Sequence, residues 1–206
     1  REWEREWLRD FGPMRFGVRL WVCPTGSEPD RSNAVVVRLD PGLAFGTGTH
    51  ATTAMCLEWL DSIELQGRTV LDYGCGSGVL AIAALKLGCA HAHAMDIDMQ
   101  AITATRENAA QNGVQERLTV STSPDDIEGQ FDVVIANILA GPLVELAESV
   151  SDRVRSGGQL ALSGILSEQA ADIIAAYAPR IDFDNPEFRE QDGQKWTRLT
   201  GRKRHS

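Results

Sequence analysis

Residues 70–78 read Val-Leu-Asp-Tyr-Gly-Cys-Gly-Ser-Gly, the most informative segment of the sequence. An apolar run meets an acidic residue and then three alternating glycines, Gly74, Gly76 and Gly78. Glycine has no Cβ, so the backbone can turn sharply and approach a ligand closely. A helix that begins at such a turn offers unpaired N–H groups. Asp96 ends the next apolar run, where a carboxylate can accept hydrogen bonds from ribose hydroxyls. These signals predict a nucleoside-bearing cofactor.

The spacing of the glycines distinguishes between two cofactors. A nicotinamide site has Gly-x-Gly-x-x-Gly, and counting from Gly74 the last of these positions is Val79. Asp72 stands just ahead of the turn and would repel a diphosphate, whereas it suits a zwitterionic ligand. The pattern Asp-x-Gly-x-Gly-x-Gly, with an acid after the next strand, resembles class I S-adenosylmethionine-dependent methyltransferases. We therefore expect S-adenosylmethionine, with Asp72 and the three glycines as candidate contacts, and keep an NAD-dependent oxidoreductase as the alternative of another class.

From Thr69 onward, apolar periodicity predicts alternating strands and helices. The expected strands are 69–73, 91–96, 117–121, 131–136 and 159–163, and the expected helices are 78–88, 99–112, 140–154 and 167–177. Two extended runs, 181–188 and 194–202, flank the turn signal Gln-Asp-Gly at 191–193. This rhythm predicts an α/β fold, a doubly wound, Rossmann-like, mostly parallel sheet with a C-terminal antiparallel hairpin.

The segment ahead of this sheet is expected to contain a lead-in, a β-hairpin, a loop and a helix. Residues 1–20 read as a linker helix and lead-in, and 21–206 as the catalytic domain. Runs 16–22 and 34–39 are rich in β-branched residues and predict a β-hairpin. A glycine- and hydroxyl-rich loop over 41–53 then leads into a helix-like stretch at 53–60.

Composition bounds the class of protein. The 206 residues fit one domain, and a net charge of −9 argues against extended nucleic-acid binding. That charge favours a basic protein partner, although many acidic enzymes have none. The four cysteines form no Cys-x-x-Cys pair, and no histidine stands at zinc-ligand spacing, so we expect reduced thiols and no metal. No apolar run approaches the roughly 20 residues that cross a bilayer, so we expect no membrane partner and a cytoplasmic protein.

Ligands of doubly wound sheets bind beyond the carboxyl ends of the strands, and acidic residues gather at that edge. Asp96 is the expected ribose ligand because it directly ends a strand. Asp98 is expected to cap the next helix. Asp125 or Asp126, after the third strand, could accept a hydrogen bond from the adenine amino group, although acidic turns of this kind are also common without a ligand.

Asn137 follows the fourth strand and is the expected catalytic residue. It resembles the asparagine of the Asn-Pro-Pro-Tyr loop of amino-methyltransferases, whose oxygens accept N–H bonds and aim the nitrogen lone pair at the methyl group. It need not act as a base, because positioning and a dry site can supply much of the acceleration. Residues 138–140 are Ile-Leu-Ala and contain no aromatic to stack a nucleobase, which favours an aliphatic amine or an amide. The alternative role for Asn137 is an N-cap of helix 140–154.

The loop ahead of the first strand supplies further candidates. Thr47, Thr49 and Thr53 offer hydroxyls to the cofactor, and Phe45 could wall the methyl-transfer channel. His50 could relay a proton, although a lone loop histidine more often has a structural hydrogen-bonding role.

Three stretches together point to one family: Leu-Asp-Pro-Gly-Leu-Ala-Phe-Gly-Thr-Gly-Thr-His-Ala-Thr-Thr at 39–53, the glycine turn at 70–78, and Asn-Ile-Leu-Ala-Gly-Pro-Leu at 137–143. Their combination closely resembles the PrmA family, bacterial methyltransferases of ribosomal protein L11, over nearly all of the chain. The resemblance implies trimethylation of lysine side chains and of the N-terminal amine of that protein. It also implies cofactor contacts at Thr53, Gly74, Asp96 and Asn137.

The resemblance also implies a small N-terminal substrate-recognition domain, which we expect to be absent from this chain. On that expectation the chain binds S-adenosylmethionine but methylates its protein poorly. The nearer alternative is a small-molecule or glutamine-amide N-methyltransferase. A noncatalytic binding module is the remaining alternative.

Overall fold

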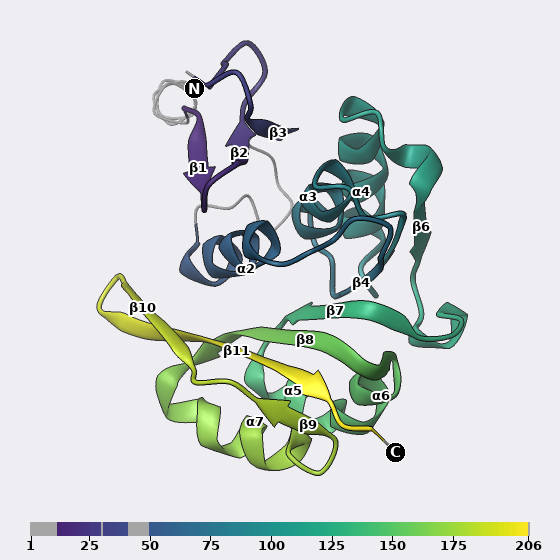
Figure 1. The fold of residues 1–206 in the computed structure, drawn as a ribbon, viewed down its shortest axis with the longest axis vertical. Helices are drawn as coiled ribbons and strands as arrows, with labels where there is room; N and C mark the ends of the chain where they lie inside the picture. The colour runs from purple at the N-terminus through teal and green to yellow at the C-terminus, as the bar shows by residue number, and fades with distance from the viewer. Residues whose placement is uncertain (1–11, 30, 41–49, 206) are drawn as a thin grey trace.

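The computed structural model describes residues 12–29, 31–40 and 50–205, which form two sheets and the helices packed on them (Figure 1). The larger sheet has eight strands: β4 (Thr69–Tyr73), β5 (His91–Met95), β6 (Leu118–Ser121), β7 (Phe131–Asn137), β8 (Val154–Leu166), β9 (Ile181–Phe183), β10 (Glu187–Gln191) and β11 (Gln194–Lys203). Strands β6, β5, β4, β7 and β8 lie in that order and run parallel. β11 is antiparallel to β8, β9 and β10. The predicted doubly wound sheet with a C-terminal antiparallel hairpin is confirmed.

Helices cover both faces of this sheet (Figure 1). They are α2 (Ala51–Ser62), α3 (Val79–Lys86) and α4 (Met99–Gln111) on one face, and α5 (Ala140–Glu145), α6 (Ala147–Asp152) and α7 (Ala170–Tyr177) on the other. Side chains alternate across the central strands, so the sheet divides two apolar cores. Val133 and Ile135 belong to the core under α2 and α3, whereas Val134 and Ala136 belong to the core under α5 to α7. The strand order reverses between β4 and β7, which is where ligands bind in such sheets.

The expected helix 140–154 differs from the structure. Two short helices replace it because Leu146 leaves the helical region (φ −93°, ψ 9°). β8 then begins at Val154, earlier than the expected start at 159. Val154 pairs with Phe131, and the register then shifts so that Val133 pairs with Gln159, which places the glycine pair at 157–158 in an irregular part of β8. Pairing with a neighbouring strand extends β8 where the sequence shows no apolar alternation.

The predicted β-hairpin between runs 16–22 and 34–39 is wrong. The smaller sheet contains β1 (Met14–Phe16), β2 (Leu20–Cys23) and β3 (Val35–Arg38), and β2 pairs with β3 in parallel. The hairpin partner of β2 is β1, through a turn that contains Gly17 at φ +73°. Asp61 of α2 accepts three backbone N–H bonds at this turn, from residues 18–20 at 2.7–3.1 Å. A contact from a distant helix therefore decides which strands form the hairpin.

Two other boundaries concern the site. α2 begins at Ala51, two residues before the expected start, and His50 is its N-cap. The C-terminal hairpin turns through Asp192 (φ +53°) and Gly193 (φ +76°), the two left-handed residues that a tight hairpin turn requires.

No helix in the described part of the chain is long and apolar enough to cross a membrane. Among residues 12–29, 31–40 and 50–205, no group of three or more histidine, cysteine or acidic side chains could hold a metal ion.

Candidate functional site

The glycine turn joins β4 to α3 at the carboxyl edge of the sheet. Gly74, Gly76 and Gly78 have φ values of +84°, +54° and +82°, a region that favours glycine. A Cβ on Gly74 would lie 2.4 Å from Ile138 Cγ2, and one on Gly78 would lie 2.7 Å from Thr105 Cγ2. Neighbouring side chains already fill the space that a larger residue would need, so both packing and backbone conformation require glycine at Gly74 and Gly78.

Asp96 connects this turn to the end of β5. Its Oδ2 accepts a hydrogen bond from the Gly76 N–H at 2.9 Å, and its Oδ1 accepts one from the Asp98 N–H at 3.0 Å. Each carboxylate oxygen can accept a second bond, so the half-buried group retains acceptors for ribose hydroxyls. The predicted helix cap is confirmed, because Asp98 Oδ1 accepts from the Gln100 N–H at 2.9 Å.

Asp72 lies beneath the turn and is completely buried. Its Oδ2 accepts from the Ala81 N–H at 3.2 Å, and its Oδ1 has no hydrogen-bond partner among the described residues. Burial raises the pKa of Asp72 to about 7, with a smaller contribution from the charge of Asp96 and an opposing one from the Ala81 hydrogen bond. Asp72 therefore anchors the first turn of α3, and a direct contact with the cofactor stays a prediction.

Asn137 ends β7 and faces α2. Its Nδ2 donates to Thr53 Oγ1 at 3.2 Å, although the two residues are 84 positions apart. The following Ile138 N–H donates to Ser163 O at 3.1 Å. A Cβ on Gly164 would lie 2.5 Å from Ile138 O, so β8 packs directly against this loop. With the amide NH₂ bound to Thr53, the amide oxygen is the atom that could accept an amine N–H.

The alternative role of Asn137 as a helix cap is wrong. The N-cap of α5 is Leu139, and no side chain caps that helix. Asn137 lies ahead of the N-cap residue Leu139, and its side-chain amide donates to Thr53 instead of capping the helix.

His50 has a structural role as the N-cap of α2, and a proton relay through it stays a prediction. Its Nδ1 caps α2 by accepting from the Thr52 N–H at 3.2 Å and lies 2.9 Å from Thr52 Oγ1. Its ring meets Trp196 edge-on, with centroids 4.7 Å apart. Phe45, Thr47 and Thr49 lie outside the described residues, so their roles stay predictions.

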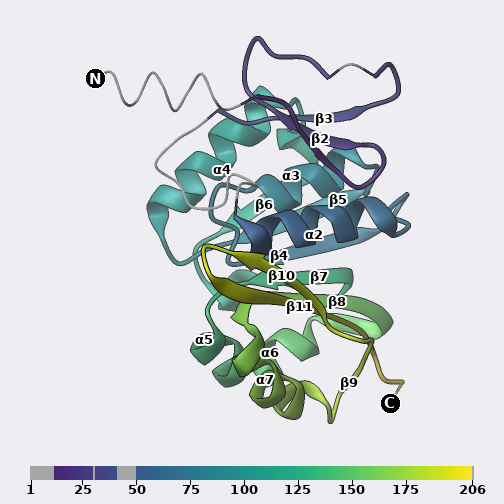
Figure 2. The same cartoon turned by 90° about the vertical axis from the view of Figure 1, so that its left-hand side faces the viewer.

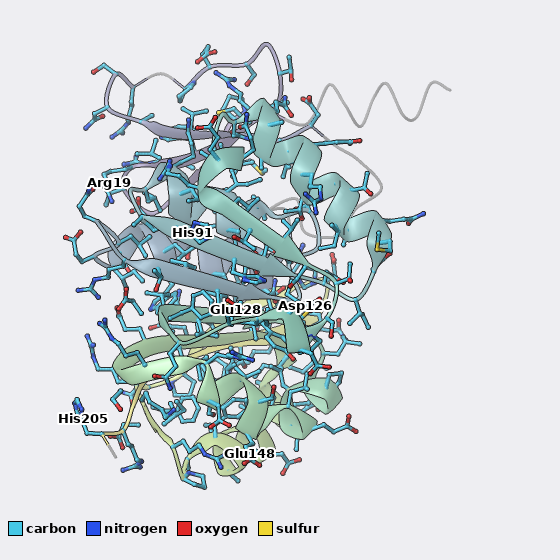
Figure 3. The ribbon with its side chains drawn as sticks, turned by 90° about the vertical axis from the view of Figure 1, so that its right-hand side faces the viewer. Arg19, His91, Asp126, Glu128, Glu148 and His205 are labelled. Atoms are coloured by element: carbon cyan, nitrogen blue, oxygen red, sulfur yellow. The ribbon has the colours of Figure 1, made fainter. Side chains whose placement is uncertain are left out.

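Asp125 and Asp126 lie in the 3₁₀ turn η2 (Pro124–Asp126) after β6. Ser123 Oγ accepts from the Asp125 N–H at 3.2 Å, which fixes the turn, and both carboxylates are exposed. Figure 3 shows Asp126 and Glu128 on the segment that leads from β6 into β7. A hydrogen bond to the adenine amino group stays a prediction for either residue.

Two polar residues of α4 support the turn and were not predicted. Buried Thr105 donates to Gly76 O at 3.0 Å, and Asn108 Nδ2 donates to Ser77 O at 2.9 Å. Their spacing of three places them on one helix face, but nothing local to that helix identifies the turn as its neighbour. Ile97 and Met99 flank the Asp96 strand end and are exposed by 80% and 64%. Their exposure is visible only in the structure, because the sequence does not show which apolar side chains face solvent.

Comparison with known proteins identifies the family of the chain. The chain matches the family described as ribosomal protein L11 methyltransferase (PrmA) over residues 1–204. The chain belongs to the PrmA family. A PrmA relative from Klebsiella pneumoniae (strain 342), named ribosomal protein L11 methyltransferase, is 58% identical over 204 residues, which cover 98% of this chain and 68% of the relative. A relative of the same name from Pectobacterium carotovorum is 54% identical over 209 residues, covering 100% and 69%.

A solved PrmA relative shares the fold. The crystal structure of ribosomal protein L11 methylase from Lactobacillus delbrueckii is 33% identical, with a TM-score of 0.84 over 95% of this chain and 100% of that one. The family resemblance that the sequence indicated is confirmed, and with it the class of enzyme, a methyltransferase. Membership of PrmA sets aside the NAD-dependent oxidoreductase.

Proposed function

We propose that this chain transfers methyl groups from S-adenosylmethionine to ribosomal protein L11, trimethylating lysine side chains and the N-terminal amine. Membership of the PrmA family supports the substrate. The observation that carries the proposal is the Thr53-bound amide of Asn137, which lies at the switch point of the sheet beside the glycine turn.

The residues present fit S-adenosylmethionine. Gly74, Gly76 and Gly78 would let the backbone approach the cofactor, and Asp96 would bind its ribose. Thr53 and Asp72 are the further candidate contacts. When bound, the cofactor supplies a sulfonium methyl group whose departure leaves a neutral thioether.

Asn137 would orient the amine through its amide oxygen. An amine whose N–H donates to this oxygen presents its lone pair in a fixed direction, and this orientation lowers the barrier to methyl transfer. Residues 138–140 carry no aromatic side chain, and Leu139 is 73% exposed beside the site, so an aliphatic stem fits better than a flat base. A lysine with an ordinary pKa near 10.4 must lose its proton first, and removal from water favours that loss.

The net charge and the family support the proposed partner and cellular compartment. A net charge of −9 would attract a basic ribosomal protein and would disfavour extended contact with nucleic acid. We place the reaction in the cytoplasm, where ribosomal proteins are made, and assign the catalytic domain to 21–206, with 1–20 as its lead-in. β1 (Met14–Phe16), within that lead-in, pairs with β2.

The test is transfer of labelled methyl groups to ribosomal protein L11, followed by mass spectrometry of its peptides. We expect slow transfer of up to three methyl groups to each modified amine, and loss of that transfer in Asn137→Ala. Label on a glutamine amide or on a small-molecule amine, with none on L11, would instead support the alternative N-methyltransferase. Calorimetric binding of NADH without binding of S-adenosylmethionine would contradict the proposed cofactor.

A further inference from the structure

The proposed role of Asn137 depends on where α2 places Thr53. Thr53 is in the first turn of α2, is 3% exposed, and holds the Asn137 amide from across the sheet edge. The first N–H groups of a helix have no partner within the helix, so the position of this turn depends on outside contacts. Besides the cap that His50 provides, two such contacts come from the other end of the chain.

The C-terminal hairpin formed by β10 and β11 supplies both of them. Gln191 Oε1 accepts from the Ala51 N–H, the first N–H of α2, at 2.5 Å and from 140 residues away. The indole of Trp196 packs edge-on against His50, which is the N-cap of the same helix. Figure 1 shows the hairpin running beneath α2, and Figure 2 shows its tip on the same side as α5.

The same hairpin also holds the rest of α2. Arg198 Nη1 donates to Met55 O at 2.6 Å, in the second turn. Arg189 forms a two-pronged ion pair with Glu58, with N···O distances of 3.0 and 2.7 Å. Contacts at three successive levels of a twelve-residue helix fix its position along its axis as well as its rotation.

Ser163 of β8 contacts both α2 and the C-terminal hairpin. It is fully buried and pairs with Asn137 in the sheet register. Its Oγ lies 3.4 Å from Thr52 O and 3.3 Å from Thr197 O, so one hydroxyl contacts both α2 and β11. The backbone of Asn137 is thus set by β8, and its amide by a helix that the hairpin holds.

We propose that Gln191 and Trp196 are positioning residues for methyl transfer. They fix the first turn of α2, and through Thr53 they set the direction of the Asn137 amide. Neither residue needs to contact the cofactor or the amine. The proposal deepens the function proposed above and rests on it for the rate measurements, but not for the structural one.

The experiment compares three variants in the same chain. Gln191→Ala removes the acceptor for the Ala51 N–H. Gln191→Glu keeps an acceptor oxygen and adds a charge that a helix N-terminus favours, so it should rescue. Gln194→Ala is the matched control, because Gln194 pairs with Gln191 across the turn and is exposed. Circular dichroism and thermal melting establish that each variant is folded. Trp196→Leu, which removes the aromatic edge that packs against His50, replaces Gln191→Ala if that variant does not fold.

Two measurements test whether Gln191 positions the Asn137 amide. In NMR spectra of the free protein, Gln191→Ala should shift the side-chain amide resonances of Asn137, whereas Gln194→Ala should not. In single-turnover transfer at saturating cofactor, Gln191→Ala should be roughly fivefold to tenfold slower, the effect of one hydrogen bond, and Gln191→Glu should recover most of the rate. Because the effect passes through Thr53, Gln191→Ala should add little further loss in a Thr53→Val background.

Unchanged Asn137 resonances, or full additivity with Thr53→Val, would overturn the proposal and leave Gln191 as a stabilising residue only. If wild-type protein moves no methyl group to L11 while the Asn137 resonances still respond to Gln191→Ala, the positioning stands and the proposed substrate fails.

Discussion

The hydrogen bond from Asn137 to Thr53 should be worth about tenfold in methyl-transfer rate. Thr53→Val removes the acceptor while keeping the side-chain shape, so packing in this buried position changes little. A neutral hydrogen bond contributes about 0.5–1.5 kcal/mol, and a buried N–H without a partner costs about 1–3 kcal/mol. Water reaches part of half-buried Asn137, so we take about 1.4 kcal/mol, which is about tenfold in rate.

The assay is single-turnover transfer to L11 at saturating S-adenosylmethionine, which separates transfer from cofactor binding. Thr53→Ser keeps the hydroxyl and should retain most of the wild-type rate. Thr103→Val removes an exposed hydroxyl on α4 that bonds only its own helix, at Met99 O, and should change nothing. A wild-type rate in Thr53→Val would refute the claim that Thr53 orients the Asn137 amide.

Two further predictions concern the glycine turn and the acid beneath it. Gly74→Ala should lower the free energy of unfolding in urea by more than Gly67→Ala. Both glycines have positive φ, so either substitution should cost about 1–2 kcal/mol, but only a Cβ at Gly74 would also clash with Ile138. Equal losses in the two variants would show that the Ile138 side chain moves aside at no cost. Asp72→Asn should stabilise the protein at pH 8 but not at pH 4. Its folded pKa of about 7 lies above 3.8, so the native state binds the extra proton and wild-type stability falls as pH rises between these values, by at most about 4 kcal/mol. A pH-independent difference between Asp72→Asn and wild type in denaturant melts would contradict the raised pKa.

Local patterns in the sequence predicted the parts of the fold that local chemistry sets. The glycine turn at 70–78, the apolar strands and the Asp-Gly hairpin each depend on residues close in sequence. The strands of the smaller sheet were paired wrongly because Asp61, some 40 residues further along the chain, fixes the turn at Gly17. The break at Leu146 has no proline or glycine at that position to signal it.

The residues of the site also fall into those that the sequence predicts and those that it does not. Asp96 and Asn137 were identified because each ends an apolar strand at the ligand edge. Their partners were not, since the Thr53 bond spans 84 residues and the Gln191 bond spans 140, and neither leaves a periodic signal. The sequence predicted that Asp96 and Asn137 lie at the ligand edge of the sheet, but not which residues hold them in place.

The central claim is that Asp96 binds the cofactor while Asn137 acts on the amine. The most direct test is to measure, for Asp96→Ala and Asn137→Ala, both the calorimetric Kd for S-adenosylmethionine and the single-turnover rate of transfer to L11. We predict a much weaker Kd for Asp96→Ala, and for Asn137→Ala a near wild-type Kd with a large loss of rate. Equal loss of cofactor binding in both variants would contradict the claim and make Asn137 a structural residue.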